Sequence, residues 1–209
     1  DKTFGDHKVS GLFGYSYQDY RYRYLGAKGK GMTEGLKEID AATLDRTNSG
    51  YSKRSVLTSI IARAFYSYKN RYLITATLRR DGSSKFAKAN RYGNFPSASV
   101  GWNIAEENFM KHVGWVNQLK LRVGYGVLGN QEIDNYQYTS TITTGINYPD
   151  GKGGLLQGAF PKDFANPTIK WEETAMTNVG IDFIVLDNRL SLTCLLYTSP
   201  SPRDGLLSR

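Results

Sequence analysis

Residues 119–127 read Leu119-Lys-Leu-Arg-Val-Gly-Tyr-Gly-Val127, with an apolar or aromatic side chain at every second position. This period of two is that of a β-strand, in which successive side chains point to opposite faces of a sheet. One face of the predicted strand carries Leu, Val and Tyr, and the other carries Lys120, Arg122 and two glycines. The segment therefore predicts a strand that is apolar on one side and polar on the other.

Five more segments alternate in the same way, and a seventh strand begins at Leu190 and Leu192. The five are residues 9–17, 59–68, 72–79, 97–104 and 176–183. Each has about the length of a tilted transmembrane strand, roughly 9–11 residues. Aromatic residues at or near the ends of these runs are typical of the girdles that meet lipid headgroups. They are Tyr68, Tyr72, Trp102 and Tyr125.

Charged side chains on the polar faces bear on two possible arrangements of the strands, a soluble sandwich and a membrane barrel. A soluble sandwich would turn these charges to water and pack the aromatic faces together. A membrane barrel would turn the apolar faces to lipid and the polar faces to a wet lumen. The lumen-facing candidates are Arg63, Arg79, Lys120, Arg122 and Asp182.

The connections between the predicted strands alternate in length. The first, third and fifth are long or medium, at about 21–54, 81–92 and 129–170, and the second, fourth and sixth are shorter, at 69–71, 105–117 and 186–189. Alternate connections of an up-and-down barrel lie on the same side of the membrane, so this pattern matches long extracellular loops and short periplasmic turns. We therefore predict an all-β fold, a partial transmembrane antiparallel up-and-down barrel with about seven strands of a larger one.

The composition excludes several other classes of protein. The 209 residues carry a net charge of +8, which by itself predicts neither nucleic acid nor a membrane as partner. Aromatic residues make up 13%, which disfavours intrinsic disorder. No window approaches the roughly 20 consecutive apolar residues of a membrane-spanning helix. The single Cys excludes a disulfide framework and a Cys-ligated metal site.

The last sixteen residues differ abruptly in composition from the rest. The stretch Cys194-Leu-Leu-Tyr-Thr-Ser-Pro-Ser-Pro-Arg-Asp204 resembles the translation of a transposase adapter used in DNA sequencing, and residues 205–209 can follow from an index and the next adapter segment. The alternative is a natural Pro/Ser-rich linker. We expect part of a β-barrel over residues 1–193 and a translated adapter, not native protein, over 194–209. The chain also lacks an initiator Met, so we expect a fragment of a longer protein.

Several segments together resemble a known family. They are residues 66–86, Asn90-Arg-Tyr-Gly-Asn-Phe-Pro-Ser-Ala-Ser-Val-Gly-Trp102, residues 119–131, Asn166-Pro-Thr-Ile-Lys-Trp-Glu172, Asn178-Val-Gly-Ile-Asp-Phe183 and Asn188-Arg-Leu-Ser-Leu192. In this order they resemble the C-terminal barrel of SusC/RagA-type TonB-linked outer-membrane transporters. The resemblance is specific over about 55–140 and 166–193, and loose over 1–54.

The resemblance implies energised nutrient import across the outer membrane of a Gram-negative bacterium. A large barrel plugged by an N-terminal domain would take up oligosaccharides or peptides. A SusD-like surface lipoprotein would cap the barrel, and the TonB complex would drive it through N-terminal parts that this chain lacks. The implied partners are therefore this lipoprotein, the TonB complex, the substrate and outer-membrane lipid, with no nucleic acid.

No residue pattern predicts an enzyme, a cofactor site or a metal site. Residues 124–129 satisfy G-x-G-x-x-G, but the glycines lie within an alternating strand and no helix is predicted after them. Asp81-Gly-Ser-Ser84 is most simply a turn. Glu172 and Glu173 are adjacent on a strand, so they point to opposite faces and cannot easily act as a paired acid and base.

Aromatic residues in the long connections are candidates for contact with a sugar or with a lipoprotein cap, although ordinary loop packing is the simpler expectation. They are Tyr20, Tyr22, Tyr136, Tyr138, Tyr148 and Phe160. Two alternatives for the whole protein stay open on the sequence. One is a barrel that does not use TonB, such as a passive porin, and the other is a soluble β-sandwich binding module. The sequence does not identify the substrate, because the loops carry no motif that indicates a particular ligand.

Overall fold

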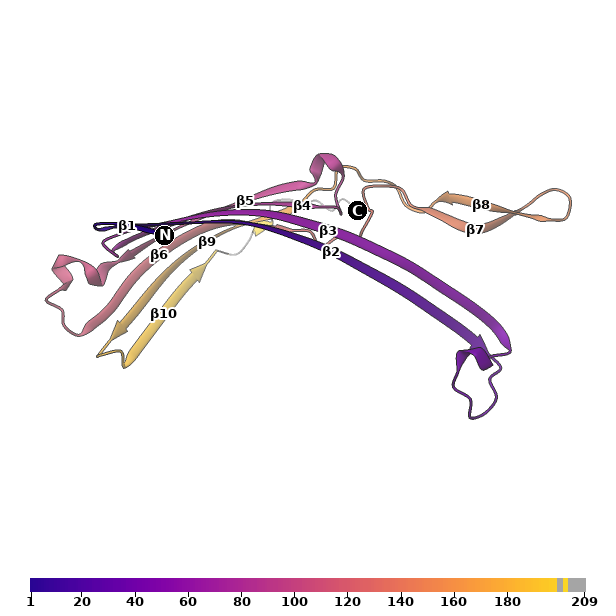
Figure 1. Cartoon of the computed structure of the whole chain (residues 1–209), viewed down its shortest axis with the longest axis horizontal. Coiled ribbons are helices and arrows are strands. Elements are labelled where there is room, and N and C mark those ends of the chain that lie inside the picture. Colours follow the sequence, from indigo (N-terminus) through magenta and orange to yellow (C-terminus); the bar gives the residue numbers. More distant parts are fainter. Residues whose placement is uncertain (199–200, 203–209) are drawn as a thin grey trace.

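The computed structural model describes residues 1–198 and 201–202, and most of its regular structure is strand. Seven strands form the body of the main sheet: β2 (His7–Lys30), β3 (Leu44–Tyr68), β4 (Tyr72–Ser83), β5 (Tyr92–Asn103), β6 (Val116–Asn130), β9 (Glu172–Val185) and β10 (Leu190–Tyr197). Each pairs antiparallel with the next in that order. The predicted partial up-and-down barrel is confirmed as an open, curved antiparallel sheet (Figure 1).

The remaining elements are short strands and 3-10 turns. β1 (Lys2–Phe4) pairs with β2, and β11 (Ser201–Pro202) pairs with β9. β7 (Ile142–Pro149) and β8 (Leu155–Pro161) form a separate two-stranded hairpin. Single 3-10 turns occupy Ile39–Ala41, Lys88–Asn90, Ile104–Glu106 and Asn108–Met110. Among the described residues, no helix is long and apolar enough to cross a membrane.

The register between strands aligns the predicted apolar faces into cross-strand rows. In one such row Val123 of β6 lies opposite Val100 of β5 and Val179 of β9. These side chains are exposed, at 43%, 53% and 41%. A face of exposed apolar side chains on a sheet that has no second layer among the described residues is not the buried face of a soluble sandwich. We call this the apolar face.

A three-residue connection sets the register between β3 and β4, with Tyr68 opposite Tyr72. Lys69 and Asn70 both have positive φ, at 52° and 54°, and Arg71 N–H donates to the Tyr68 carbonyl at 2.9 Å. Two central residues with positive φ define the type I′ turn, whose twist suits a hairpin, and Asn tolerates that conformation. The predicted short connection at 69–71 is therefore present.

The predicted first connection, at about 21–54, is wrong. β2 continues to Lys30 and β3 begins at Leu44, so the connection is confined to residues 31–43. The pairing runs without a shift from His7–Tyr68 to Lys28–Thr47. Figure 1 shows this hairpin reaching well beyond its neighbours. The aromatic side of β2 changes face after Tyr17, because Tyr15 and Tyr17 stand at odd positions and Tyr20 and Tyr22 at even ones. Only the pairing of the two strands shows that they continue through this change.

A small core lies where three separated segments meet at one end of the sheet. Phe86, Phe95 and Trp171 are all buried. The Trp171 ring centroid lies 5.1 Å from that of Phe86 and 5.3 Å from that of Phe95. Its indole N–H donates to the Arg91 carbonyl at 2.9 Å. The cluster therefore fixes the segment before β9 against the β4–β5 connection.

The predicted boundary at Thr193 falls inside strand β10. Residues Cys194–Tyr197 continue the strand, opposite residues 178–181 of β9. Residues 199–200 and 203–209 of the predicted adapter lie outside the described residues. The assignment of residues 194–209 to an adapter remains a prediction.

Candidate functional site

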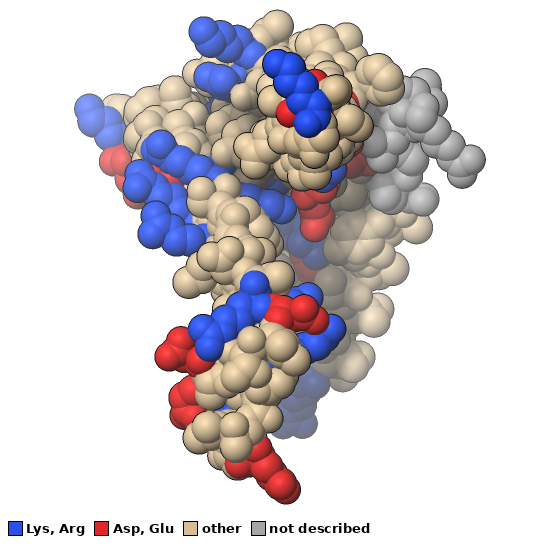
Figure 2. All heavy atoms as spheres, turned by 90° about the vertical axis from the view of Figure 1, so that its right-hand side faces the viewer, with Lys and Arg blue, Asp and Glu red and all other residues tan. Residues whose placement is uncertain are grey.

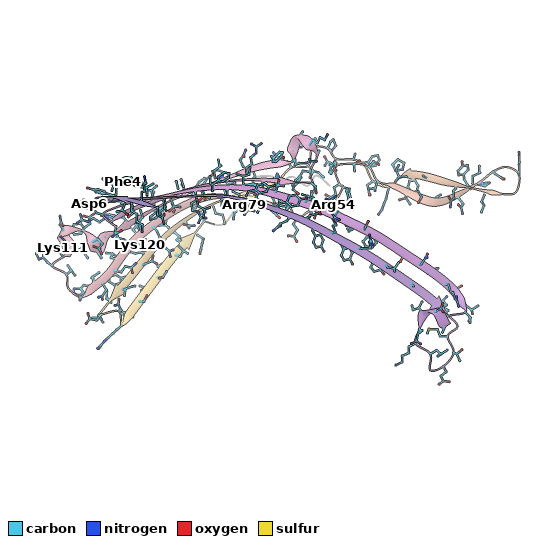
Figure 3. All side chains as sticks on the ribbon, in the orientation of Figure 1. Phe4, Asp6, Arg54, Arg79, Lys111 and Lys120 are labelled. Carbon is cyan, nitrogen blue, oxygen red and sulfur yellow. The ribbon has the colours of Figure 1, made fainter. Side chains whose placement is uncertain are left out.

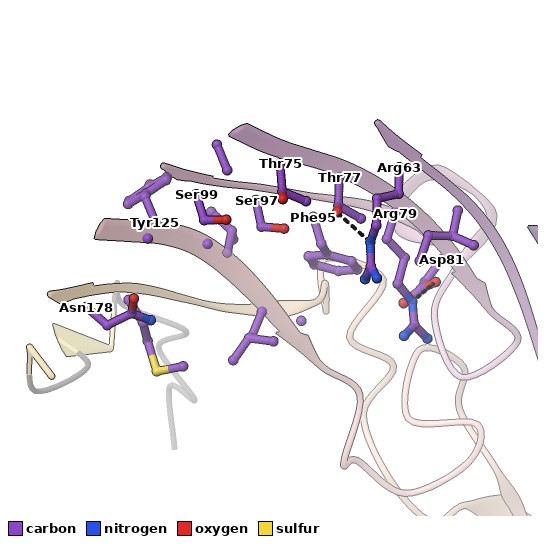
Figure 4. A pocket seen from close by; sticks show the side chains of 18 residues that line it. Arg63, Thr75, Thr77, Arg79, Asp81, Phe95, Ser97, Ser99, Tyr125 and Asn178 are labelled. Carbon is purple, nitrogen blue, oxygen red and sulfur yellow. Dashed lines mark hydrogen bonds and ion pairs between the residues drawn. The ribbon is translucent and has the colours of Figure 1, made fainter. Parts of the chain in front are cut away.

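The face of the sheet opposite the apolar face carries a hollow of about 510 Å³ (Figure 4). Strands β3, β4, β5, β6 and β9 all contribute to its wall. Figure 4 shows hydroxyl side chains of Thr75, Thr77, Ser97 and Ser99 on this side, near the side chains of Arg63 and Arg79. We call this the polar face. It presents hydroxyl and guanidinium donors to whatever occupies the hollow.

The two arginines of this hollow are held differently. Arg63 donates from Nε to the Thr77 hydroxyl at 3.1 Å and has no carboxylate partner among the described residues. Arg79 donates from Nε to Asp81 Oδ1 at 2.8 Å. Asp81 is buried, whereas the Arg79 side chain is 48% exposed. The hollow thus combines one neutralised guanidinium with one whose charge is not paired.

A second hollow of about 260 Å³ lies on the same face and is lined by Lys120 and Arg122. Arg122 donates to Asp182 Oδ1 at 3.2 Å, and Thr193 donates to the same oxygen at 3.2 Å. The strand register places Lys120 directly opposite Asp182. All five lumen-facing candidates therefore lie on the polar face, in two groups separated along the strands.

The glycines of the G-x-G-x-x-G match leave room for side chains of neighbouring strands. A Cβ at Gly129 would collide with the Phe95 ring, and one at Gly124 would lie 2.6 Å from Asn178 Oδ1. The match lies entirely within β6, and the described chain after it has no helix. Close packing between strands accounts for these glycines, so they do not form a phosphate-binding loop.

Only some of the predicted loop aromatics lie in loops. Tyr136 and Tyr138 occupy the irregular connection after β6, as expected. Tyr20 and Tyr22 lie in β2, Tyr148 in β7 and Phe160 in β8. Their assignment to loops was wrong, because two connections that looked irregular contain paired strands.

Tyr20 and Tyr22 line a hollow of about 330 Å³ at the end of the molecule with the long connections. The rest of its wall comes from β3, the β4–β5 connection and the β6–β7 connection: Lys53, Ser55, Lys85, Ile133, Asp134 and Asn135. Figure 2 looks at this end and shows many Lys and Arg side chains on it. Two phenol rings beside ammonium, amide and carboxylate groups can bind a polar solute by stacking and hydrogen bonding.

Glu107 contacts three polar side chains, and the sequence alone did not predict these contacts. Its carboxylate accepts hydrogen bonds from the Tyr72 phenol at 2.7 Å and the Trp102 indole at 3.1 Å, and it pairs with Arg71 at 3.2 Å. The hydrogen bond from Tyr72, then that from Trp102, lowers the pKa of Glu107 below its ordinary 4.5. A Glu after a predicted strand carries no signal of such contacts, since all three donors come from elsewhere in the sequence.

Two groups in turns have shifted pKa values for local reasons. The backbone N–H groups of Lys152 and Gly154 donate to Asp150 at the tip of the β7–β8 hairpin and lower its pKa. The hydrogen bond with Asp6 raises the pKa of Lys69, and the two groups lie 3.3 Å apart. Both arrangements stabilise turns.

Within residues 1–198 and 201–202, no group of three or more His, Cys, Asp or Glu side chains is placed to hold a metal ion. Glu172 pairs with Asn130 through a 3.0 Å hydrogen bond rather than with Glu173. The polar face therefore offers hydrogen bonds and charge for binding, and we find on it no paired acid and base among the described residues.

Comparisons with known proteins agree on one family. No family model matches the chain. The chain is 36% identical over 218 residues to TonB-dependent receptor P39 of Formosa agariphila, a match covering 98% of the chain and 20% of that receptor. It is 41% identical over 167 residues to TonB-dependent receptor SusC of Bacteroides thetaiotaomicron, covering 78% of the chain and 16% of SusC.

Solved structures show the same likeness. The structure of the RagAB peptide transporter superimposes with a TM-score of 0.83 at 26% identity, covering 93% of the chain and 21% of the matched chain. The RagAB peptide importer in its open-open state gives a TM-score of 0.82 at 26% identity. The chain thus spans about a fifth of the length of the relatives that it matches.

Proposed function

The chain belongs to the SusC/RagA-type TonB-dependent receptors, and on this premise we propose that it forms part of the barrel wall of an outer-membrane nutrient importer. One observation carries the proposal: the strand register separates an exposed apolar face from a polar face that carries all five charged candidates. In a membrane barrel the first meets lipid and the second lines the interior. The importer lies in the outer membrane of a Gram-negative bacterium, and it has no enzymatic activity.

The polar face contacts the plug and the passing substrate. Arg63 lacks a carboxylate partner among the described residues, and Arg122 and Lys120 share Asp182 as a neighbour. This excess of cationic groups in a partly enclosed space favours carboxylates, which a plug domain or an anionic substrate would supply.

The hollow beside Tyr20 and Tyr22 contacts the substrate at the extracellular mouth. It combines aromatic rings with Lys53, Lys85 and Asn135, which suits an oligosaccharide or a peptide. The RagAB structures are described as those of a peptide transporter, and the SusC relative is a TonB-dependent receptor. A SusD-like surface lipoprotein caps this mouth.

Uptake by the complete receptor tests the function. The full gene is expressed together with its neighbouring lipoprotein gene, and uptake of labelled oligosaccharides and peptides is measured with and without TonB. We expect uptake that disappears when TonB is deleted. Uptake that persists without TonB would instead establish a passive barrel.

A Tyr20→Ala/Tyr22→Ala variant tests the contact at the mouth. We expect at least about a fivefold loss of apparent substrate affinity, as aromatic anchors at binding sites contribute more than 1 kcal/mol. Phe164→Ala is the matched control, because Phe164 is fully exposed and does not line this hollow. Equal effects of the two variants would overturn the assignment of this hollow.

A further inference from the structure

The apolar face changes character abruptly toward the end with the long connections. Along β2 it carries Phe13, Tyr15 and Tyr17, exposed by 76%, 64% and 54%. The next two residues on the same face are Asp19 and Arg21. The register places Arg54 of β3 directly opposite Arg21. Exposed apolar side chains thus give way to charged ones within one or two residues.

The other end of the apolar face is marked by an aromatic row. Tyr68, Tyr72 and Trp102 lie in adjacent register positions on β3, β4 and β5. At the opposite end, a second register row runs from Tyr17 through Thr58 and Gly82 to Tyr92, with a tyrosine at each of its ends. The two rows have the placement of the two aromatic girdles of a transmembrane barrel.

The distance between the rows fits a membrane. Thr58 and Tyr68 are ten residues apart on β3, which is about 33 Å along a strand and about 25 Å along the membrane normal at a tilt near 40°. This is the height of the apolar band of an outer-membrane barrel. Arg54 lies four residues beyond Thr58, or about 10 Å further along the normal, at the level of lipid headgroups.

The charged residues at this level keep donors free for a ligand. The Asp19 carboxylate accepts from Arg54 Nε at 2.9 Å and Nη2 at 3.0 Å, and from Arg21 Nη2 at 3.0 Å. Two guanidinium groups thus share one carboxylate, and their side chains remain 54% and 70% exposed. Arg23 follows on the same face and adds a further positive charge.

Arg80 brings a fourth arginine to the edge of the apolar band. Its guanidinium lies over the Tyr92 ring, 5.0 Å from the centroid, so the long side chain extends from the apolar band to the girdle. A hollow of about 460 Å³ lies beside it, lined by Tyr15, Thr58, Ile60, Arg80 and Tyr92. Glu173 is the acidic residue at the same register level, but it lies three strands away from Arg80, about 14 Å.

We propose that Arg21, Arg54 and Arg80, the arginine patch, bind the phosphate groups of an anionic glycolipid in the outer leaflet. Arg21 and Arg54 form one contact, and Arg80 forms a separate one nearer the apolar band, because its register partner Ile60 lies six residues, or about 20 Å, from Arg54 along β3. The occupant is a membrane lipid rather than the transported substrate, because the patch continues the apolar face and lies on the opposite side of the sheet from the polar face. Guanidinium groups bind phosphate oxygens with charge-assisted, often bidentate hydrogen bonds. The inference rests on the outer-membrane location given under Proposed function.

Lipid binding by the purified complete receptor tests this proposal. The probes are a phosphorylated lipid A in detergent, its dephosphorylated form and inorganic phosphate, and the readout is the dissociation constant. We expect the phosphorylated lipid to bind most tightly, and Arg54→Gln/Arg80→Gln to weaken it about fivefold per arginine, or about 25-fold. The control is Lys2→Gln/Lys111→Gln, which removes the same charge away from the patch. Lys2 lies in β1, and Lys111 lies at the opposite end of the molecule from Arg54 (Figure 3).

A second variant separates ligand binding from a structural charge network. Asp19→Asn removes the competing carboxylate but leaves both guanidinium groups, so lipid affinity should be kept or raised. If Asp19→Asn lowers the affinity as much as the arginine variant does, the cluster only holds the hairpin together. Equal binding of both lipid forms, or equal loss in the lysine control, would also overturn the proposal.

Substrate uptake by the same variants distinguishes a failure of the lipid site from a failure of the proposed importer function. If the receptor binds the phosphorylated lipid but imports nothing, the proposed function fails and the lipid site stands. If uptake is TonB-dependent and the arginine variant binds lipid normally, the lipid site fails and the proposed function stands.

Discussion

Tyr72 donates a 2.7 Å hydrogen bond from its phenol to Oε1 of Glu107, and so ties the first residue of β4 to the connection after β5. The same carboxylate binds the Trp102 indole and the Arg71 guanidinium. Glu107 thus joins the β3–β4 turn to the β5–β6 connection. These are two of the shorter connections, so the cluster lies at the end of the sheet opposite the long ones.

Replacing Glu107 tests whether this cluster stabilises the barrel. Glu107→Gln should lower the urea midpoint of the complete receptor in lipid vesicles at neutral pH. Because the folded state lowers the pKa of Glu107, its stabilisation is full above the unfolded value near 4.5 and is lost as the pH falls through the folded value. The difference between wild type and variant should therefore shrink below about pH 4.5. Glu106→Gln is the control, since Glu106 is exposed, and an equal effect of both variants would contradict the expectation.

Trp171 should be the most important single residue of the small core. Trp171→Ala removes a buried indole that contacts Phe86 and Phe95, so we expect about 3–5 kcal/mol of lost unfolding free energy. Equilibrium urea unfolding in vesicles measures this loss. Phe164→Ala should change stability by less than about 0.5 kcal/mol, because that ring is fully exposed. A loss below about 1 kcal/mol for Trp171→Ala would show that this cluster does not fix the segment before β9 against the β4–β5 connection.

Gly129 should resist even the smallest enlargement. A Cβ at this position would collide with the Phe95 ring, so Gly129→Ala should cost about 1–3 kcal/mol of unfolding free energy. At Gly114 a Cβ would meet nothing within 4 Å, so Gly114→Ala should be nearly neutral. The same unfolding assay compares the two variants. Equal costs would mean that Phe95 moves aside freely.

Arginine substitutions can distinguish the two faces of the sheet. Ala76 lies on the apolar face between Ala64 and Ala98, near the middle of the apolar band. Ala76→Arg should cost about 2–4 kcal/mol in a bilayer, the penalty for a charge that faces lipid at mid-depth. Thr75→Arg, one residue away, points into the hollow of the polar face and should cost much less. A cost for Thr75→Arg equal to that of Ala76→Arg would argue against a lipid-facing apolar face.

The predicted adapter can be tested on DNA. Sequencing the source locus through the end of this reading frame should show barrel-coding sequence in place of codons 194–209. Finding the same sixteen codons in unamplified source DNA would establish them as native. In that case β10, which runs to Tyr197, is native over its whole length.

The sequence by itself determined the strands and the faces of their side chains. Alternation with a period of two is a local property, so runs such as residues 119–127 and 72–79 predict both a strand and the side of each residue. The register between strands then placed Arg63, Arg79, Lys120, Arg122 and Asp182 on one side of the sheet, as the alternation predicts. The length of the connections likewise predicted which end carries the long ones.

Only the tertiary structure decided where a strand continues after its aromatic side changes face, and which distant residues meet. Tyr20 and Tyr22 alternate with Arg21 and Arg23, but the aromatic residues of β2 change from odd to even positions after Tyr17, and pairing with β3 shows that one strand continues through this change. The contacts of Glu107 and Trp171 join residues up to 85 positions apart in the chain, which no local pattern encodes. The arginine patch depends on the same long-range pairing, because Arg54 comes opposite Arg21 only when two strands of more than twenty residues align.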